Sequence, residues 1–352
     1  MPHLPEPDYL PTASLKRLQE RSQLLACLRE HFVAHGYWEC ETPILSRDIV
    51  VDANLDPFVT HDADGSTFYL QTSPEAGMKR LLAAGATAIF QVSRVMRKGE
   101  VGQRHNPEFT MVEWYRVGDS YFDQMSFVEG LVRVINAAAQ RRDEPVFNAL
   151  ETVSWSGNFE TDPTPVPQPF ERLAYDAAFE RFVGTRVLKL SSRELRQLAG
   201  DNRVVIPQSL SLDDHDGWLN LLLAELIEPQ LGRAAPQFLC DYPASQAALA
   251  RLRDADPPVA ERFELYDRGV ELCNGYQELT DSEELLARTQ AERERRTTSG
   301  ASDLPGASRL AEAMQAGLPP CCGVALGFDR LVMLALGCSR LDEVIAFPRD
   351  RA

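Results

Sequence analysis

The chain has 352 residues, of which 44% are hydrophobic, and its formal net charge is −16 at pH 7. This length allows a large core within one domain. The negative charge repels nucleic acid at long range, and no run of Lys or Arg with interleaved aromatic residues predicts a local surface for it. The sequence also has no apolar stretch of membrane length. Composition therefore argues against nucleic-acid and membrane partners, and it suits a cationic ligand or a basic protein partner.

The cysteines and histidines predict neither disulfides nor a zinc site. The seven cysteines are odd in number and include no Cys-x-x-Cys pair, and the six histidines do not follow zinc-ligand spacing. We expect buried free thiols in a reducing, cytoplasmic environment.

The first predicted elements follow a short extension. Residues 1–14 are rich in proline and lack the apolar core of a signal peptide, so residues 15–352 are expected to form the folded domain. The sequence predicts a helix from Ser14 to Ala34 and a strand from Tyr37 to Pro43.

A second helix is predicted to begin in the run Thr72-Ser73-Pro74-Glu75. Ser73 can cap the helix, Pro74 suits its first position, and Glu75 complements the helix dipole in the first turn. Gly85 is expected to end it.

Residues 88–117 predict two strands joined by a loop. Residues 88–97 are typical of a buried strand, residues 97–105 of a polar loop, and residues 109–117 of an alternating strand. The alternation places four side chains on one face: Phe109, Met111, Glu113 and Tyr115. This face suits a pocket in which one ring stacks on a base and Tyr115 offers its hydroxyl to a polar ligand. The alternative is a half-exposed strand with Glu113 paired to a surface Arg.

Two segments predict little regular structure. Residues 151–169 contain Ser154-Trp155-Ser156-Gly157 and then a Pro/Thr run, which is typical of a long surface loop. Residues 297–306 are rich in Ser, Gly and Pro and precede an Ala-rich helix.

Residues 262–279 predict a β-hairpin around Asp267-Arg268-Gly269. A turn centred between Asp267 and Arg268 would place Tyr266 opposite Gly269 and Glu264 opposite Glu271. Two carboxylates about 5 Å apart on neighbouring strands repel unless a hard cation lies between them. We therefore expect Glu264 and Glu271 to hold a hard cation such as Mg²⁺. The alternative is that each acid pairs with a nearby Arg, such as Arg262 or Arg268.

Three further side chains on the second strand, Asn274, Tyr276 and Glu278, have a parity opposite to that of Glu271. All four can face one pocket only if the strand slips by one residue, which predicts a β-bulge near Leu272-Cys273. Glu278 is then the candidate for binding a distal ammonium group, with Tyr276 along the aliphatic stem. An ordinary exposed acid at a strand end is the alternative.

The stretch from Gly323 to Ala335 predicts a strand that turns at Gly327 into an apolar helix. The missing side chains at Gly323 and Gly327 would let a flat ligand lie against the backbone. Arg330, in the first helical turn, presents a planar donor fork suited to phosphate or a stacked purine. A buried strand–helix corner with one satisfied Arg is the alternative.

Three segments together carry a family resemblance. Residues 36–43 resemble the end of the first motif of lysyl-tRNA synthetases, which forms their dimer interface, and residues 105–115 resemble their second motif. Residues 323–335 resemble the third signature motif of class II aminoacyl-tRNA synthetases. The resemblance runs from about Leu15 to Ala352 and covers the catalytic domain without the anticodon-binding OB-fold. It points to a smaller paralogue, the elongation factor P–(R)-β-lysine ligase family.

This resemblance implies an α/β fold of the α+β type, with a mixed, mostly antiparallel sheet flanked by helices, in a homodimer. It implies that ATP, with Mg²⁺ at Glu264 and Glu271, activates β-lysine. The activated β-lysine is then attached to a lysine side chain of elongation factor P, and no tRNA is expected to take part.

The positions that match the family motifs imply which residues are catalytic, which bind ATP and which bind the amino acid. Arg97 and Arg330 are expected to be catalytic, with Arg97 bridging the amino-acid carboxylate and the α-phosphate. The ATP-binding residues are expected to be Arg97, Lys98, Gly99, Glu100, Asn106, Phe109, Glu271, Leu272, Gly327 and Arg330. The amino-acid-binding residues are expected to be Ser73, Pro74, Glu75, Tyr115, Asn274, Tyr276, Glu278 and Ala325.

Two positions depart from lysyl-tRNA synthetases. Gly99 stands where they have the acid that reaches the adenine amino group, so either Glu100 takes that role or the backbone around Lys98 and Gly99 does. Ala325 stands where they have Gly, and its methyl group is expected to fill space that the α-amino group of lysine would occupy. Two alternative functions remain open: a lysyl-tRNA synthetase working without its anticodon domain, and a catalytically inactive binding module.

Overall fold

The computed structural model describes residues 9–141 and 168–352. The first eight residues of the expected N-terminal extension, and residues 151–167 of the expected surface loop, lie outside the described residues.

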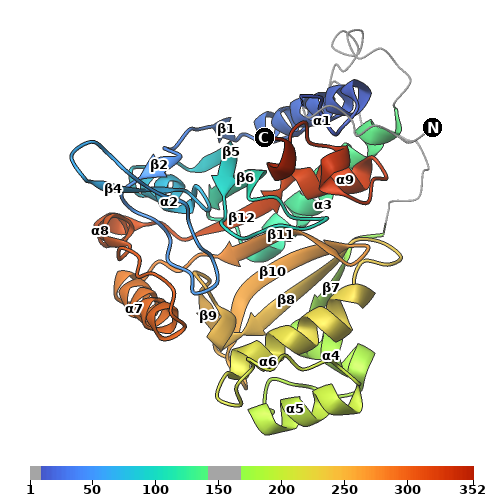
Figure 1. The fold of residues 1–352 in the computed structure, drawn as a ribbon, viewed down its shortest axis with the longest axis vertical. Helices are drawn as coiled ribbons and strands as arrows, with labels where there is room; N and C mark the ends of the chain where they lie inside the picture. Colours follow the sequence, from blue (N-terminus) through green and yellow to red (C-terminus); the bar gives the residue numbers. More distant parts are fainter. Residues whose placement is uncertain (1–8, 142–167) are drawn as a thin grey trace.

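A mixed sheet forms the centre of the fold (Figure 1). Over the described ranges it has nine strands: eight follow one another across the sheet, and the short β9 (Leu252–Arg253) pairs with β10. Their order is β1 (Trp38–Glu39), β5 (Ala88–Met96), β6 (Glu108–Val117), β12 (Cys321–Gly327), β11 (Val270–Gln277), β10 (Val259–Asp267), β8 (Gln237–Pro243) and β7 (Glu171–Ala174). The pairs β1–β5 and β7–β8 are parallel and the others are antiparallel. The expected mixed, mostly antiparallel sheet is therefore confirmed.

A second, smaller sheet has the order β2 (Leu45–Ser46), β4 (Thr67–Leu70) and β3 (Val59–His61). Helices flank the main sheet, and three of them, α4 to α6, gather beside β7 and β8 at one end of the molecule (Figure 1). The helices are α1 (Leu15–Ala34), α2 (Glu75–Ala83), α3 (Tyr121–Gln140), α4 (Tyr175–Val183), α5 (Ser192–Asp201), α6 (His215–Leu222), α7 (Ser282–Thr298), α8 (Ser308–Gly317) and α9 (Phe328–Ala335). No helix of the described chain combines the length and the apolar character needed to cross a membrane.

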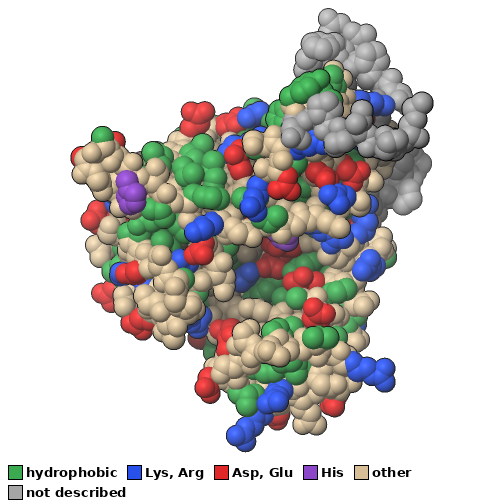
Figure 2. All heavy atoms as spheres, viewed as in Figure 1, with side chains coloured by type: hydrophobic (Ala, Val, Ile, Leu, Met, Phe, Trp, Pro, Cys, Tyr) green, Lys and Arg blue, Asp and Glu red, His purple; other side chains and the backbone are tan. Residues whose placement is uncertain are grey.

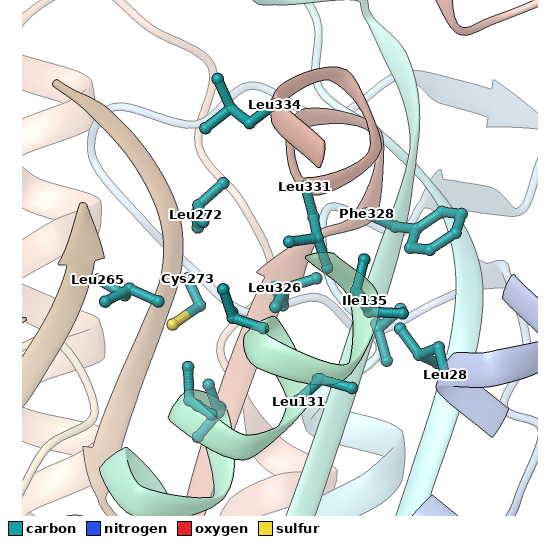
Figure 3. Close-up of a cluster of buried hydrophobic side chains, with 14 of the residues drawn as sticks. Leu28, Leu131, Ile135, Leu265, Leu272, Cys273, Leu326, Phe328, Leu331 and Leu334 are labelled. Atoms are coloured by element: carbon teal, nitrogen blue, oxygen red, sulfur yellow. The ribbon is translucent and has the colours of Figure 1, made fainter. Parts of the chain in front are cut away.

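The largest core lies between one face of the sheet and helices α1, α3 and α9 (Figure 3). Side chains from distant parts of the chain meet there: Leu28 of α1, Leu131 and Ile135 of α3, Leu265 of β10, Leu272 and Cys273 of β11, Leu326 of β12, and Phe328, Leu331 and Leu334 of α9. Because this face is filled with apolar side chains, the polar side chains of the same strands occupy the opposite face.

Local chemistry places most of the element boundaries where the sequence predicts them. The hydroxyl of Ser14 caps α1 by accepting a hydrogen bond from the backbone N–H of Arg17. The next helix begins one residue later than expected: Pro74 is its N-cap and Glu75 its first residue, while the Ser73 hydroxyl accepts from the N–H of Glu75 at 3.0 Å. Gly85 follows the last turn with φ of +107°. The expected strand from Tyr37 to Pro43 is wrong in length, because only Trp38 and Glu39 pair with β5.

Candidate functional site

A pocket of about 800 Å³ opens on the polar face of the sheet, and Figure 2 shows acidic side chains inside the hollow. The pocket is lined by strands β6, β10, β11 and β12, by the beginnings of α2 and α9, and by the turn that follows α6. The four predicted side chains of β6 all line it: Phe109, Met111, Glu113 and Tyr115. The alternation of that strand therefore predicted its pocket-facing side correctly.

One end of the pocket presents two arginines. The guanidinium group of Arg97 lies 5.2 Å from the centre of the Phe109 ring, donates to the backbone oxygen of Thr72 at 3.3 Å, and contacts Glu100 at 3.5 Å. A cation over an aromatic face is favourable, and this contact holds Arg97 beside the ring expected to stack on adenine.

Arg330, the second arginine, is held by β11 and the loop before β6. It donates to the backbone oxygen of Glu271 at 3.0 Å and to its carboxylate at 3.3 Å. Its other nitrogen lies 2.6 Å from Nε2 of His105. Burial, followed by the charge of Arg330, lowers the pKa of His105, so the ring is neutral at pH 7 and Nε2 can accept this hydrogen bond.

The hairpin register differs from the prediction by one residue. Its turn is centred between Arg268 and Gly269, both with positive φ, so Tyr266 lies opposite Glu271 and Glu264 lies opposite Asn274. The expected direct pairing of Glu264 with Glu271 is therefore wrong. Arg268 adopts φ of +53°, a conformation that a non-glycine residue seldom takes, which is why the sequence did not indicate it.

The predicted bulge is confirmed. The register shifts between Leu265 and Tyr266 of β10, so that Leu272 is the extra residue on β11. The shift brings Glu271, Asn274, Tyr276 and Glu278 to the same pocket, as the sequence predicted.

Glu264 accepts more hydrogen bonds than the sequence predicts. Its carboxylate accepts hydrogen bonds from Tyr242 at 2.5 Å, from Tyr266 at 2.6 Å and from Arg262 at 2.6 Å. The ion pair with Arg262 is the alternative that the sequence left open, whereas Arg268 pairs with Asp267 instead.

The acids around Glu264 and Glu271 nevertheless fit a hard cation. Desolvation inside the pocket, reinforced by the charge of Glu264, raises the pKa of Glu271, although its side chain is not fully buried. Burial together with both acids raises the pKa of Glu228 to about 7. These shifts indicate uncompensated negative charge in one place. No three acidic, His or Cys side chains of the described chain are grouped closely enough to hold a metal by themselves. Two carboxylates completed by phosphate oxygens and water suit Mg²⁺, and Glu264 and Glu271 would hold it.

The two carboxylates should respond differently to substitution. We expect Glu271→Gln and Glu264→Gln each to lower Mg²⁺-dependent adenylate formation at least about tenfold, because each removes a charged oxygen ligand. Glu264→Gln should also cost about 1–3 kcal/mol of stability, because Arg262 loses its charged partner. The side chain of Glu271 is 39% exposed, so Glu271→Gln should change stability little.

Pyrophosphate–ATP exchange across Mg²⁺ concentrations, with a melting curve for each variant, measures both effects. Full activity of both variants at limiting Mg²⁺ would show that the metal assignment is wrong.

The other end of the pocket is a buried acidic cluster, which we define as Glu75, Glu113 and Glu278. Glu113 accepts hydrogen bonds from Ser73 at 2.7 Å and from Tyr115 at 2.5 Å. Glu278, the expected partner of a distal ammonium group, is already in an ion pair with Lys79 at 2.5 Å. Lys79 also contacts Glu75 at 2.6 Å. Lys79 lies four residues after Glu75 on α2, a spacing that predicts an ion pair, but the sequence-based prediction did not include Lys79.

The two glycines of β12 have different roles. A methyl group at Gly323 would overlap Tyr115 and Glu278, so this glycine makes room for two protein side chains of the pocket wall. A methyl group at Gly327 would have no neighbour closer than 3.8 Å, so this backbone is open to the pocket as predicted.

Most of the other expected site residues line the pocket: Ser73, Glu75, Arg97, Glu100, Asn106, Asn274, Tyr276 and Ala325. Lys98, Gly99 and Pro74 do not. Leu272 packs its side chain into the core, so only its backbone is available to a nucleotide. Asn106 uses its amide to hold the chain, donating to the backbone oxygen of Glu108 and accepting from the N–H of Arg349.

The glycine at position 99, where lysyl-tRNA synthetases have an acid, has a structural reason. Gly99 has φ of +88°, which favours glycine, and it does not line the pocket, whereas Glu100 does.

Comparison with known proteins gives consistent matches along the chain. Residues 8–351 match the model of the family described as tRNA synthetases class II (D, K and N). The protein from Vibrio cholerae named elongation factor P–(R)-β-lysine ligase is 40% identical over 98% of this chain and 99% of its own length. Proteins of the same name from Vibrio vulnificus and Salmonella arizonae are 38% and 39% identical, each over 97% of this chain and 98% of its own length.

Proposed function

Because the chain belongs to the class II tRNA synthetase (D, K and N) family and, within it, to the elongation factor P–(R)-β-lysine ligases, we propose that it activates (R)-β-lysine with ATP and transfers it to a lysine ε-amino group of elongation factor P. The observation that carries the proposal is the division of one pocket lining between two kinds of group. Arg97 and Arg330 supply guanidinium groups suited to phosphate and carboxylate, and the buried acidic cluster supplies carboxylates suited to ammonium groups.

This division fits an amino acid with an ammonium group far from its carboxylate. The carboxylate lies toward Arg97, and the ammonium groups lie toward Glu75, Glu113 and Glu278. Tyr276 lines the stem between them. The arrangement brings the carboxylate to the α-phosphate of ATP in a fixed orientation, which is the main contribution an enzyme makes to such a reaction.

Activation is an in-line displacement in which a carboxylate oxygen bonds to the α-phosphorus and pyrophosphate leaves. Arg97 bridges the two reacting groups, and its guanidinium group stabilises the negative charge that grows on the α-phosphate. Arg330 holds the leaving phosphates with its donor fork. Mg²⁺, when bound at Glu264 and Glu271, neutralises phosphate charge. No protein nucleophile is needed.

In the second step, the neutral ε-amine of the acceptor lysine attacks the carbonyl carbon of the mixed anhydride. An amide bond forms, AMP leaves, and the amine loses a proton. The anhydride is reactive enough that this step requires little beyond access to the pocket. The net charge of −16 disfavours tRNA as the acceptor and suits a basic segment of a protein.

The acceptor is tested by competition in one reaction. The protein is incubated with ATP, labelled (R)-β-lysine, tRNA and elongation factor P, and the label is followed into each macromolecule. We expect label on elongation factor P only. Label on tRNA would indicate a lysyl-tRNA synthetase without its anticodon domain. Absence of amino-acid-dependent pyrophosphate–ATP exchange would indicate an inactive, synthetase-like module.

The protein is also proposed to work in the cytoplasm as a homodimer formed through α1 and the β1 region. Exposed apolar side chains gather in this part of the chain: Val33, Trp38, Ile44, Leu45 and Val59. Covering them in a dimer would remove apolar surface from water. Light scattering at micromolar concentration should give twice the mass of the chain, and a monomer would contradict the proposal.

A further inference from the structure

Lys79 is a buried cation directly behind the amino-acid end of the pocket. Its side chain is 1% exposed, and it does not line the pocket itself. It contacts two residues that line the pocket, Glu75 and Glu278, with its ammonium nitrogen 2.6 Å and 2.5 Å from their carboxylate oxygens. A fully buried lysine is rare, and it is stable here because two carboxylates compensate it.

The charges of this region can be counted from the contacts. The acidic cluster supplies three carboxylates, and Lys79 supplies one ammonium group. Two negative charges therefore remain uncompensated when all four groups are ionised. An amino acid with two ammonium groups would compensate both, whereas an amino acid with one would leave a buried charge, which is costly.

We propose that Lys79 is a positioning residue that fixes Glu75 and Glu278 and sets the charge of the pocket to match an amino acid carrying two ammonium groups. The proposal rests on the proposed function only in taking an amino acid as the ligand of this end of the pocket. Lys79 acts through the two carboxylates, so its removal should alter amino-acid binding and leave ATP binding unchanged.

The titratable and charged groups that face Lys79 and the acidic cluster come from four elements and from the residue that follows β1. They are Glu75 of α2, Glu113 and Tyr115 of β6, Tyr276 and Glu278 at the end of β11, Cys321 and Cys322 of β12, and Cys40 after β1. Burial and the charge of Glu75 raise the pKa of both Glu113 and Glu278, while the charge of Lys79 lowers both. The resulting pKa is about 7 for Glu113 and about 8 for Glu278. Removing Lys79 should therefore move both pKa values upward.

The upward direction of this pKa shift provides a test that distinguishes an electrostatic role of Lys79 from a role in packing alone. Ammonium groups bind to ionised carboxylates, so amino-acid affinity should increase as the pH rises through the pKa values of Glu113 and Glu278. In Lys79→Met this increase should occur at a pH about one unit higher, and KM for the amino acid at pH 7 should be about tenfold higher. The KM for ATP should be unchanged. A role in packing alone would lower kcat/KM for the amino acid equally at every pH.

A second variant restores the charge without restoring the lysine. Lys79→Met with Glu75→Gln again leaves two uncompensated charges, because one cation and one anion are removed together. The pH profile of this double variant should return toward that of the original protein. Glu75→Gln alone leaves one uncompensated charge and should bind the amino acid more weakly than the double variant does. Arg80→Met is the matched control, because Arg80 is the next cation on α2, is exposed, and lies outside the pocket.

The measurement is amino-acid-dependent pyrophosphate–ATP exchange from pH 6 to pH 9, with melting curves to confirm folding. A pH profile of Lys79→Met that matches the original protein, or a double variant that binds no better than Glu75→Gln, would overturn the proposal. If Lys79→Met alone does not fold, the comparison of Glu75→Gln with the double variant still decides. Failure of the original protein to activate either lysine isomer would instead overturn the proposed function.

Discussion

Replacing Arg97 with Ala should lower kcat/KM for adenylate formation by about a hundred- to a thousandfold, the usual cost of removing a group that stabilises developing charge. Arg97 lines the pocket, with its guanidinium group over the Phe109 ring and hydrogen-bonded to the backbone oxygen of Thr72. From there its donor fork can contact the substrate carboxylate and the α-phosphate together. Arg97→Lys keeps the charge but loses the fork, so it should recover only part of the activity.

Arg94→Ala is the control for Arg97→Ala. Arg94 lies three residues earlier on β5, is exposed, and does not line the pocket. Its nearest acid, Glu108, is 3.9 Å away at the surface, a contact of little energetic value. Pyrophosphate–ATP exchange should therefore be nearly unchanged in Arg94→Ala. Activity of Arg97→Ala close to that of the control would exclude the assigned role.

Replacing Ala325 with Gly should raise activation of α-lysine relative to β-lysine by about ten- to a hundredfold, because a methyl clash typically costs ~1–3 kcal/mol. Ala325 lies in β12 between Glu113 of β6 and Asn274 of β11, and it lines the pocket. It therefore does not merely pack beneath the sheet. With the carboxylate at Arg97 and the far ammonium at the acidic cluster, the two isomers place the remaining amino group at different points.

The ratio of kcat/KM for the two isomers measures this effect. Ala88→Gly is a matched control, because it makes the same change in a strand outside the pocket. Both variants should lose about 0.5–1 kcal/mol of stability from the added chain freedom. Only Ala325→Gly should change the isomer ratio, and an unchanged ratio would mean that the methyl group does not contact the substrate.

Much of the site followed from local patterns that the tertiary structure could not override. The alternation of β6 put Glu113 and Tyr115 on the pocket side, because successive side chains of a strand point to opposite faces. The parity conflict between Glu271 and Asn274 required a bulge, and the bulge lies at Leu272. Ser14 and Gly85 marked helix ends because capping depends on residues within one turn.

Other features depended on contacts between distant residues. The partners of Glu264 include Tyr242, which lies on the neighbouring strand β8, and no sequence pattern links the two. The space at Gly323 is taken by Tyr115 and Glu278, so its glycine serves the packing of the pocket wall. The hairpin register depended on a left-handed Arg268, a conformation that its side chain does not favour.

The sequence by itself determined which side chains of β6 and β11 face the pocket, the order of the three motifs and the family to which they point, because periodicity and local chemistry act over a few residues. The tertiary structure alone decided the charge of the amino-acid end. Lys79 belongs to a helix that the sequence predicted, yet its function depends on Glu278, which lies about 200 residues further along the chain. Burial next to an acid brought there by the sheet makes this lysine part of the site, since charges interact strongly only when they are close together and shielded from water.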